Sequence, residues 1–151
     1  MLVGASAWVD SEIEVTLDSG CVDHILDLGD APGYEAFVAE SPGSKRGQRY
    51  VVGNGGRVPN EGQLVLNLEH EVKAGDPSML RSTFQVAEVT RPLMSVSRIC
   101  DLGLKVVFDK DEALVVNAES KTVARFERRG GLYIARMRLK PPEGFPGPAT
   151  R

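Results

Sequence analysis

Short runs in which apolar and polar residues alternate recur along the chain, and this period is typical of strands with one buried face. In residues 12–17, for example, three apolar side chains are separated by polar ones: Ile13, Val15 and Leu17. Further predicted strands of this kind cover residues 49–52, 63–68, 82–89, 104–108, 113–117, 122–128 and 132–139. The pattern therefore predicts a mainly β domain.

Turn and helix signals lie between these runs. Asn54-Gly55 predicts a hairpin, because both turn residues accept positive φ. Its first strand is 49–52, and its return strand runs through Val58, is loosened at Pro59 and Gly62, and continues into residues 63–68. Residues 93–102 have apolar side chains near helical spacing, with Ser95 or Ser97 to cap the helix. Residues 27–47 are rich in proline and glycine and predict a loop region, with a short strand near 36–38.

We therefore expect an all-β fold, a small closed barrel with one short helix. The 151 residues are enough for one domain with a core. Four prolines and two glycines in residues 140–148 predict an extended tail there. Trp8 is expected to pack from a strand near the N-terminus.

The charge of the chain gives no sign of a nucleic-acid surface, because the net charge is −3. No apolar run approaches the roughly 20 residues of a membrane helix, and the first residues lack the features of a signal peptide. The two cysteines do not make a disulfide framework. We therefore expect an intracellular protein that does not interact with membranes.

Asp18-Ser19-Gly20, at the end of the strand over 12–17, is the main candidate for chemistry. Peptide hydrolysis by carboxylates needs two of them about 3 Å apart, sharing one proton. One activates a water and the other donates to the scissile carbonyl. Since the chain has one such triplet, it supplies half a site; the alternative is that the triplet is simply a turn.

Other candidates have weaker support. Cys21 and His24 are a possible pair of metal ligands, but a structural zinc site needs four, and Cys100 and His70 lack useful spacing. We therefore predict no metal and no cofactor. Cys21 lacks an identifiable base for nucleophilic catalysis. His24 is expected to form hydrogen bonds beside the loop of Asp18, Ser19 and Gly20, the aspartate loop.

A local basic region near the C-terminus, formed by five arginines, is expected to be a solvated face of a sheet. Its members are Arg125, Arg128, Arg129, Arg136 and Arg138.

Three ordered segments resemble the retropepsin-like proteases of copia-type retrotransposon polyproteins. Residues 18–25, DSGCVDHI, look like their Asp-Ser-Gly motif, and residues 51–58, VVGNGGRV, look like their flap segment. Residues 93–108, LMSVSRICDLGLKVVF, are similar to the block that follows in that family. Ser95 stands where many retropepsins have glycine but matches the copia-type block. Residues 131–133, GLY, resemble an element near the start of the pre-integrase segment.

This resemblance implies a domain over residues 12–139, preceded by an arm (1–11) and followed by a tail (140–151), with 110–139 leading into a pre-integrase-like segment. It implies a retropepsin-like barrel with Asp18 as the catalytic aspartate, supported by Ser19 and Gly20. The flap that covers the substrate would contain Gly53, Asn54, Gly55 and Gly56.

The activity that the resemblance implies is endopeptidase cleavage of a polyprotein by a homodimer. Nucleic acid would be involved only indirectly, through the parent polyprotein. The alternative is an inactive domain of the same fold that serves for dimerisation or peptide binding.

Overall fold

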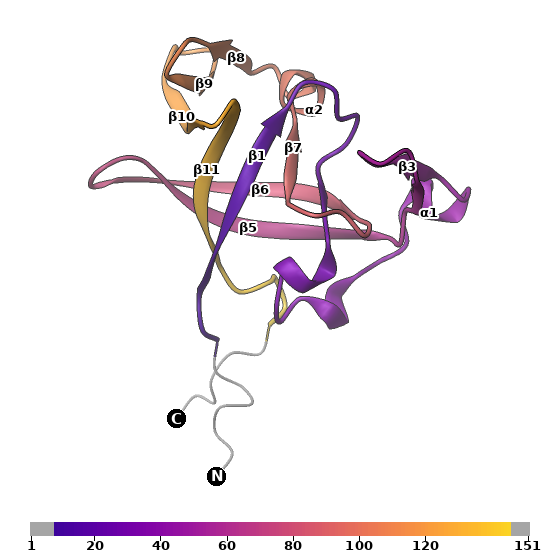
Figure 1. Cartoon of the computed structure of the whole chain (residues 1–151). Helices are drawn as coiled ribbons and strands as arrows, with labels where there is room; N and C mark the ends of the chain where they lie inside the picture. The colour runs from indigo at the N-terminus through magenta and orange to yellow at the C-terminus, as the bar shows by residue number, and fades with distance from the viewer. Residues whose placement is uncertain (1–7, 146–151) are drawn as a thin grey trace, which may run out of the picture.

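The computed structural model describes residues 8–145 and shows a mostly β-strand fold with few helices (Figure 1). The described residues contain eleven strands: β1 (Ser11–Asp18), β2 (Ile25–Leu26), β3 (Arg49–Val51), β4 (Arg57–Pro59), β5 (Gln63–Lys73), β6 (Asp76–Val86), β7 (Leu93–Ser95), β8 (Lys105–Phe108), β9 (Glu112–Val116), β10 (Thr122–Arg129) and β11 (Leu132–Leu139). Each strand expected from alternation is present except the one near residues 36–38.

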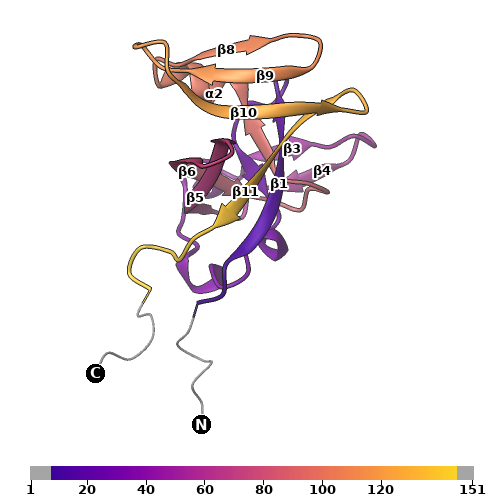
Figure 2. The ribbon, with the colours of Figure 1, turned by 90° about the vertical axis from the view of Figure 1, so that its left-hand side faces the viewer.

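Nine strands form one sheet in the order β1-β7-β2-β6-β5-β11-β10-β9-β8, and β3 and β4 form a separate two-stranded sheet. β1 lies parallel to β7 on one side and antiparallel to β11 on the other. Because β11 also pairs with β5, the pairings lead from β1 through β7, β2, β6, β5 and β11 back to β1. β10, β9 and β8 extend from β11 at one end of the molecule (Figure 2).

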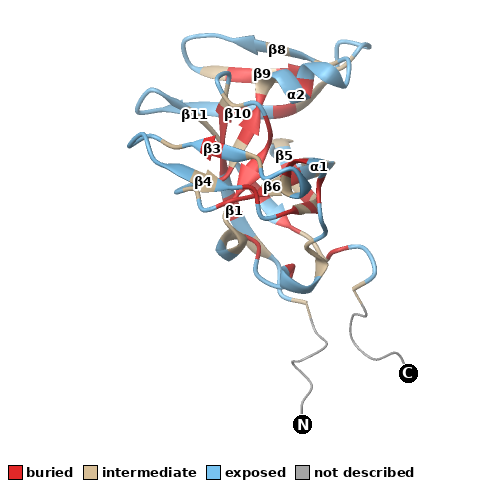
Figure 3. Cartoon of the chain, turned by 90° about the vertical axis from the view of Figure 1, so that its right-hand side faces the viewer, coloured by how far each residue is buried: buried red, intermediate tan, exposed pale blue. Residues whose placement is uncertain are grey.

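The core consists of the inward faces of these strands, as the alternation predicted (Figure 3). From Leu64 to His70 every second residue of β5 is buried, and Leu64, Leu66 and Leu68 are at most 1 % exposed. Phe84 of β6 and Phe126 of β10 are completely buried beside them. Burying such side chains contributes roughly 1.5–3 kcal/mol each before the entropy cost of folding.

The expected helix is shorter than its apolar spacing predicted. Residues 93–95 form strand β7 because they pair with the end of β1, and helix α2 covers Val96–Asp101. Ser95 caps α2, and its hydroxyl accepts a hydrogen bond from the Arg98 N–H at 3.2 Å. Gly103, at φ 84°, follows the end of the helix.

The region over residues 27–47 differs from the expectation in two respects. The strand predicted near 36–38 is wrong: Glu35–Phe37 form a 3-10 helix, as do Leu28–Asp30. A second α-helix, α1 (Pro42–Lys45), starts at a capping box between Ser41 and Ser44, so the expectation of a single helix is also wrong. Only Ala39 makes a β-bridge, to Gln63.

The hairpin of β3 and β4 is present, with a longer turn than Asn-Gly alone requires. The continuation of its return strand into residues 63–68 is wrong: β4 ends at Pro59, and residues 63–68 belong to β5, which pairs with β6 and β11 in the other sheet. The Val52 N–H donates to the Gly56 carbonyl, and Gly55 has a φ of 85°. Asn54 does not adopt positive φ; its side-chain oxygen accepts from the Gly56 N–H at 2.8 Å. The hairpin projects from the nine-stranded sheet (Figures 2 and 3).

The C-terminal part of the chain is integral to the fold. β11 pairs with six consecutive residues of β1, from Ser11 to Thr16, so the segment expected to lead into a pre-integrase-like region supplies neighbours of the strand that ends at Asp18. The predicted tail also packs on the body in its described part: the Lys140 N–H donates to the Asn67 carbonyl at 2.8 Å, and Phe145 contacts Trp8 edge to face.

Trp8 also packs against Tyr34, but it precedes β1 rather than belonging to a strand. The rest of the predicted arm and tail, residues 1–7 and 146–151, lies outside the described part of the chain.

Candidate active site

Asp18 is the last residue of β1, where the strand pairs in parallel with Ser95 of β7. Its side chain is partly exposed, and Oδ1 accepts a hydrogen bond from the Gly20 N–H at 2.8 Å. The exposed residues Ser19 and Gly20 form the turn, which the Cys21 N–H closes toward the Asp18 carbonyl at 3.5 Å. The triplet is therefore both a turn and the carrier of an accessible carboxylate on a rigid strand end.

Asp18 and the β3–β4 hairpin line a common cleft of about 1000 Å³, which we call the Asp18 cleft. Gly20 contributes from the aspartate loop, and Gly53 and Asn54 contribute from the hairpin. Ser19, Gly55 and Gly56, which the sequence placed with them, are not among the described residues that line it. The structure thus brings together residues of two of the quoted motifs, across about 35 positions of sequence.

The walls of the Asp18 cleft are mainly apolar, and besides Asp18 itself three charged residues, Arg49, Glu88 and Arg91, line it. Leu132, at the start of β11, belongs to its lining and comes from the segment that the resemblance placed beyond the protease core. The other apolar and aromatic residues of the lining are Val22, Ile25, Tyr50, Val51, Val52, Val58, Val89 and Leu93. A cleft of this composition suits an extended peptide with apolar side chains.

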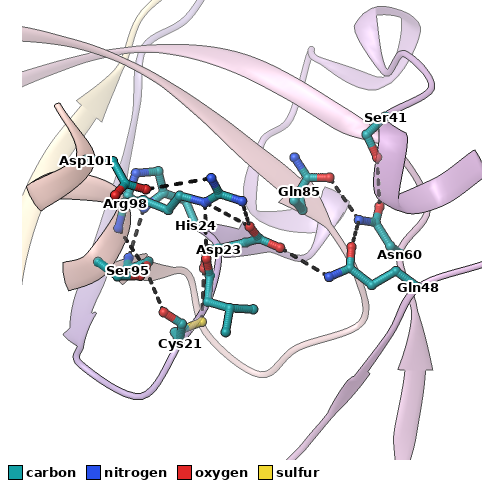
Figure 4. A network of polar contacts seen from close by, with 12 residues as sticks. Cys21, Asp23, His24, Ser41, Gln48, Asn60, Gln85, Ser95, Arg98 and Asp101 are labelled. Atoms are coloured by element: carbon teal, nitrogen blue, oxygen red, sulfur yellow. Dashed lines mark hydrogen bonds and ion pairs between the residues drawn. The ribbon is translucent and has the colours of Figure 1, made fainter. Parts of the chain in front are cut away.

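A polar network centred on the Asp23 carboxylate supports the cleft from behind (Figure 4). The Asp23 side chain is only 9 % exposed; it accepts from the Tyr50 hydroxyl at 2.7 Å and from the Arg98 guanidinium at 2.7 and 3.0 Å. Burial acts to raise the pKa of Asp23, but the hydrogen bonds from Tyr50 and Arg98 outweigh it and lower that pKa below its ordinary value. The carboxylate is held ionised and fixes the aspartate loop to α2 and β3.

The network continues to the base of the hairpin. The Asn60 amide donates to the Gln48 side chain at 3.0 Å, to the Tyr50 hydroxyl at 3.2 Å and to the Gln85 side chain at 2.9 Å (Figure 4). Because Gln48 directly precedes β3, Tyr50 lies within β3 and Asn60 directly follows β4, both ends of the hairpin are anchored. Residues 53–56 at its tip are exposed.

His24 lies behind the aspartate loop, 8 % exposed, and packs against the ring of Phe84. Its Nδ1 accepts a hydrogen bond from the Ser95 N–H at 2.9 Å, which confirms the expected hydrogen-bonding role. Burial and the nearby charge of Arg98 lower the pKa of His24 to about 4, against a smaller opposing effect of Asp23. The neutral imidazole therefore joins the aspartate loop to β7.

Cys21 and His24, the two candidate metal ligands, both form hydrogen bonds to main-chain groups. The Cys21 thiol donates to the Asp23 carbonyl at 3.0 Å, and burial raises its pKa, which does not favour a thiolate. His24 uses Nδ1 for the main chain. Across residues 8–145 no three His, Cys, Asp or Glu side chains form a group suited to a metal ion.

Five residues that organise the site carry no signal in the sequence pattern that marks them as a group: Asp23, Gln48, Tyr50, Asn60 and Arg98. Asp23 and Arg98 both lie within the quoted motifs, but they are 75 positions apart and nothing local pairs them. The only available signal was an ionisable residue, Asp23, two positions before the apolar strand β2. Burial there requires a partner.

The basic region is a paired surface rather than an open positive patch. Carboxylates of neighbouring strands lie within ion-pair distance of four of its five arginines; the pairs are Arg125–Glu112, Arg129–Glu14, Arg136–Glu12, Arg136–Glu14 and Arg138–Glu69. Arg128 donates instead to the Lys110 carbonyl. This supports the expectation of a solvated sheet face.

Comparisons with protein-family models, curated proteins and solved structures find no match for this chain. Within residues 8–145, no helix has the length and apolar character needed to cross a membrane.

Proposed function

We propose that the chain is an aspartic endopeptidase of the retropepsin type that cleaves a polyprotein as a homodimer. The observation that carries the proposal is that Asp18, on a strand end, lines the same cleft as the glycine-containing hairpin. The ring of strand pairings from β1 back to β1 supports the closed, retropepsin-like barrel that belongs to this proposal.

The proposed reaction needs two copies of the chain. Asp18 of one copy, as a carboxylate, takes a proton from water while the water attacks the scissile carbonyl; Asp18 of the other copy, protonated, donates to the carbonyl oxygen. The two carboxyls share one proton and titrate as a pair. A two-fold axis must therefore relate the copies, with the same residue at the centre from each side.

The supporting residues have structural roles that fit this reaction. The Gly20 N–H orients the Asp18 carboxylate at 2.8 Å, and the Asp23 network holds the loop that carries it. The apolar walls would bind side chains of the substrate and exclude water when the hairpin closes. Activity would depend on protein concentration, because only the dimer has a complete site.

The test is cleavage of unfolded casein, or of a mixture of peptides, at about pH 5 by the full chain. Asp18→Asn should reduce the rate at least about 100-fold, because the amide can neither serve as the base nor share the proton. Asp76→Asn, at the distant start of β6, is the matched control and should cleave normally. If Asp18→Asn cleaves like the unaltered chain, the protease assignment is wrong. If a folded dimer cleaves nothing under any condition, the inactive binding module replaces it.

A further inference from the structure

β8 is the outermost strand of the nine-stranded sheet, and on its outer side no described strand pairs with it (Figure 2). Its apolar side chains are unusually open: Val107 is 49 % exposed and Phe108 is 43 % exposed, and Leu102 just before it is 74 % exposed. An apolar edge with free main-chain groups is a template for another strand.

The hydrogen bonds of the β8–β9 hairpin determine which main-chain groups face outward. The Asp109 N–H donates to the Glu112 carbonyl at 2.8 Å, and Val107 lies opposite Leu114. Because hydrogen-bonded and non-bonded pairs alternate along an antiparallel ladder, Lys105, Val107 and Asp109 direct their main-chain groups toward β9. Val106 and Phe108 direct theirs to the free edge.

The free edge is complementary to itself. When two copies of β8 lie antiparallel about Val107, Val106 of each copy is opposite Phe108 of the other, and these are the residues whose main-chain groups are free. The same register places Lys105 of each copy opposite Asp109 of the other, on one face of the sheet. No described carboxylate lies within salt-bridge distance of Lys105 in the single chain.

We propose that two copies of this chain pair through the edge of β8, in the register centred on Val107, to form a sheet that continues across the two-fold axis. The partner is a second copy because both the charges and the free main-chain groups match under a two-fold rotation. The inference rests on the proposed function, which requires two copies of the chain. Along the chain, α2 and β8 follow β7, the strand that pairs with Asp18.

Sedimentation equilibrium of the full chain over a range of concentrations tests the interface. Lys105→Glu puts two like-charged pairs across the axis and should weaken the dimer about tenfold. Lys121→Glu, in the exposed β9–β10 turn, makes the same change of charge and should leave dissociation unchanged. A chain that is monomeric at every concentration, or a dimer that both variants affect equally, overturns the proposal.

Val106→Pro provides a second test, because it removes the outward N–H without breaking a β8–β9 bond. It should weaken the dimer about tenfold or more, with thermal unfolding to confirm a folded chain; if it does not fold, Lys105→Glu decides alone. Casein cleavage separates the two proposals. If Lys105→Glu and Val106→Pro weaken the dimer as expected but the unaltered dimer cleaves no casein, the interface is supported and the protease assignment is refuted. Cleavage with dissociation unchanged in all variants refutes the interface and leaves the protease standing.

Discussion

His24 should make the folded chain sensitive to acid, and His24→Asn should remove that sensitivity. In the fold, Nδ1 of the neutral ring accepts from the Ser95 N–H, and Arg98 lies nearby. If Nδ1 were protonated, its N–H would face the Ser95 N–H, and neither group could accept. The ring would also carry a positive charge in a buried site beside Arg98. Asparagine offers an amide oxygen near the position of Nδ1 but does not titrate in this range.

The size of the effect follows from the two pKa values. The pKa of histidine is 6.5 when unperturbed and about 4 for His24 in the fold, so the unfolded chain binds the proton more tightly. Stability from this group is present above pH 6.5 and is lost as the pH falls from 6.5 toward 4. The full loss is about 3 kcal/mol, of which about 2 kcal/mol falls between pH 7 and pH 5.

Urea unfolding at pH 7 and pH 5, at one protein concentration, measures this contribution. His24→Asn is expected to be less stable at pH 7, because the contact with Phe84 is lost. Its further loss on acidification should be about 2 kcal/mol smaller than that of the unaltered chain. A variant at the other histidine, His70→Gln, should keep the His24 contribution. Equal losses in the unaltered chain and His24→Asn would refute the reasoning.

Two further predictions concern stability. Gly62→Ala should lower the free energy of unfolding by more than about 2 kcal/mol, because φ is +130° and the new Cβ would lie 2.6 Å from the Ala39 carbonyl oxygen. In the same urea unfolding assay, Gly75→Ala is the control: its φ is +80° but its Cβ would meet no atom within 4 Å, so it should cost about 1 kcal/mol. Tyr34→Phe should cost about 1 kcal/mol, because the hydroxyl donates to the Lys140 carbonyl at 2.7 Å; an unchanged urea midpoint would show that this contact with the C-terminal segment does not contribute.

Much of the secondary structure could be predicted from the sequence because it depends on neighbouring residues. The alternation in residues 63–68 sets one face of β5, and Ser95 caps α2 through a contact three residues away. The wrong predictions arise where local preference is weak. Residues 93–95 have helical spacing, but they form a strand because they pair with β1. Residues 35–37 form a 3-10 helix directly after the buried Tyr34. Contacts with distant strands outweigh weak local preference.

Of the site, the sequence by itself determined the chemical types: a carboxylate at a strand end, a glycine-containing hairpin and a capped helix behind them. Only the tertiary structure decided that Asp18 and Asn54 line one cleft and that the buried Asp23 carboxylate is paired with Arg98. It also decided that β8 is an outer edge while β11 is enclosed between β1 and β5. Periodicity fixes which face of a strand is buried, whereas the choice of neighbour depends on how the whole chain shares its hydrogen bonds and apolar surface.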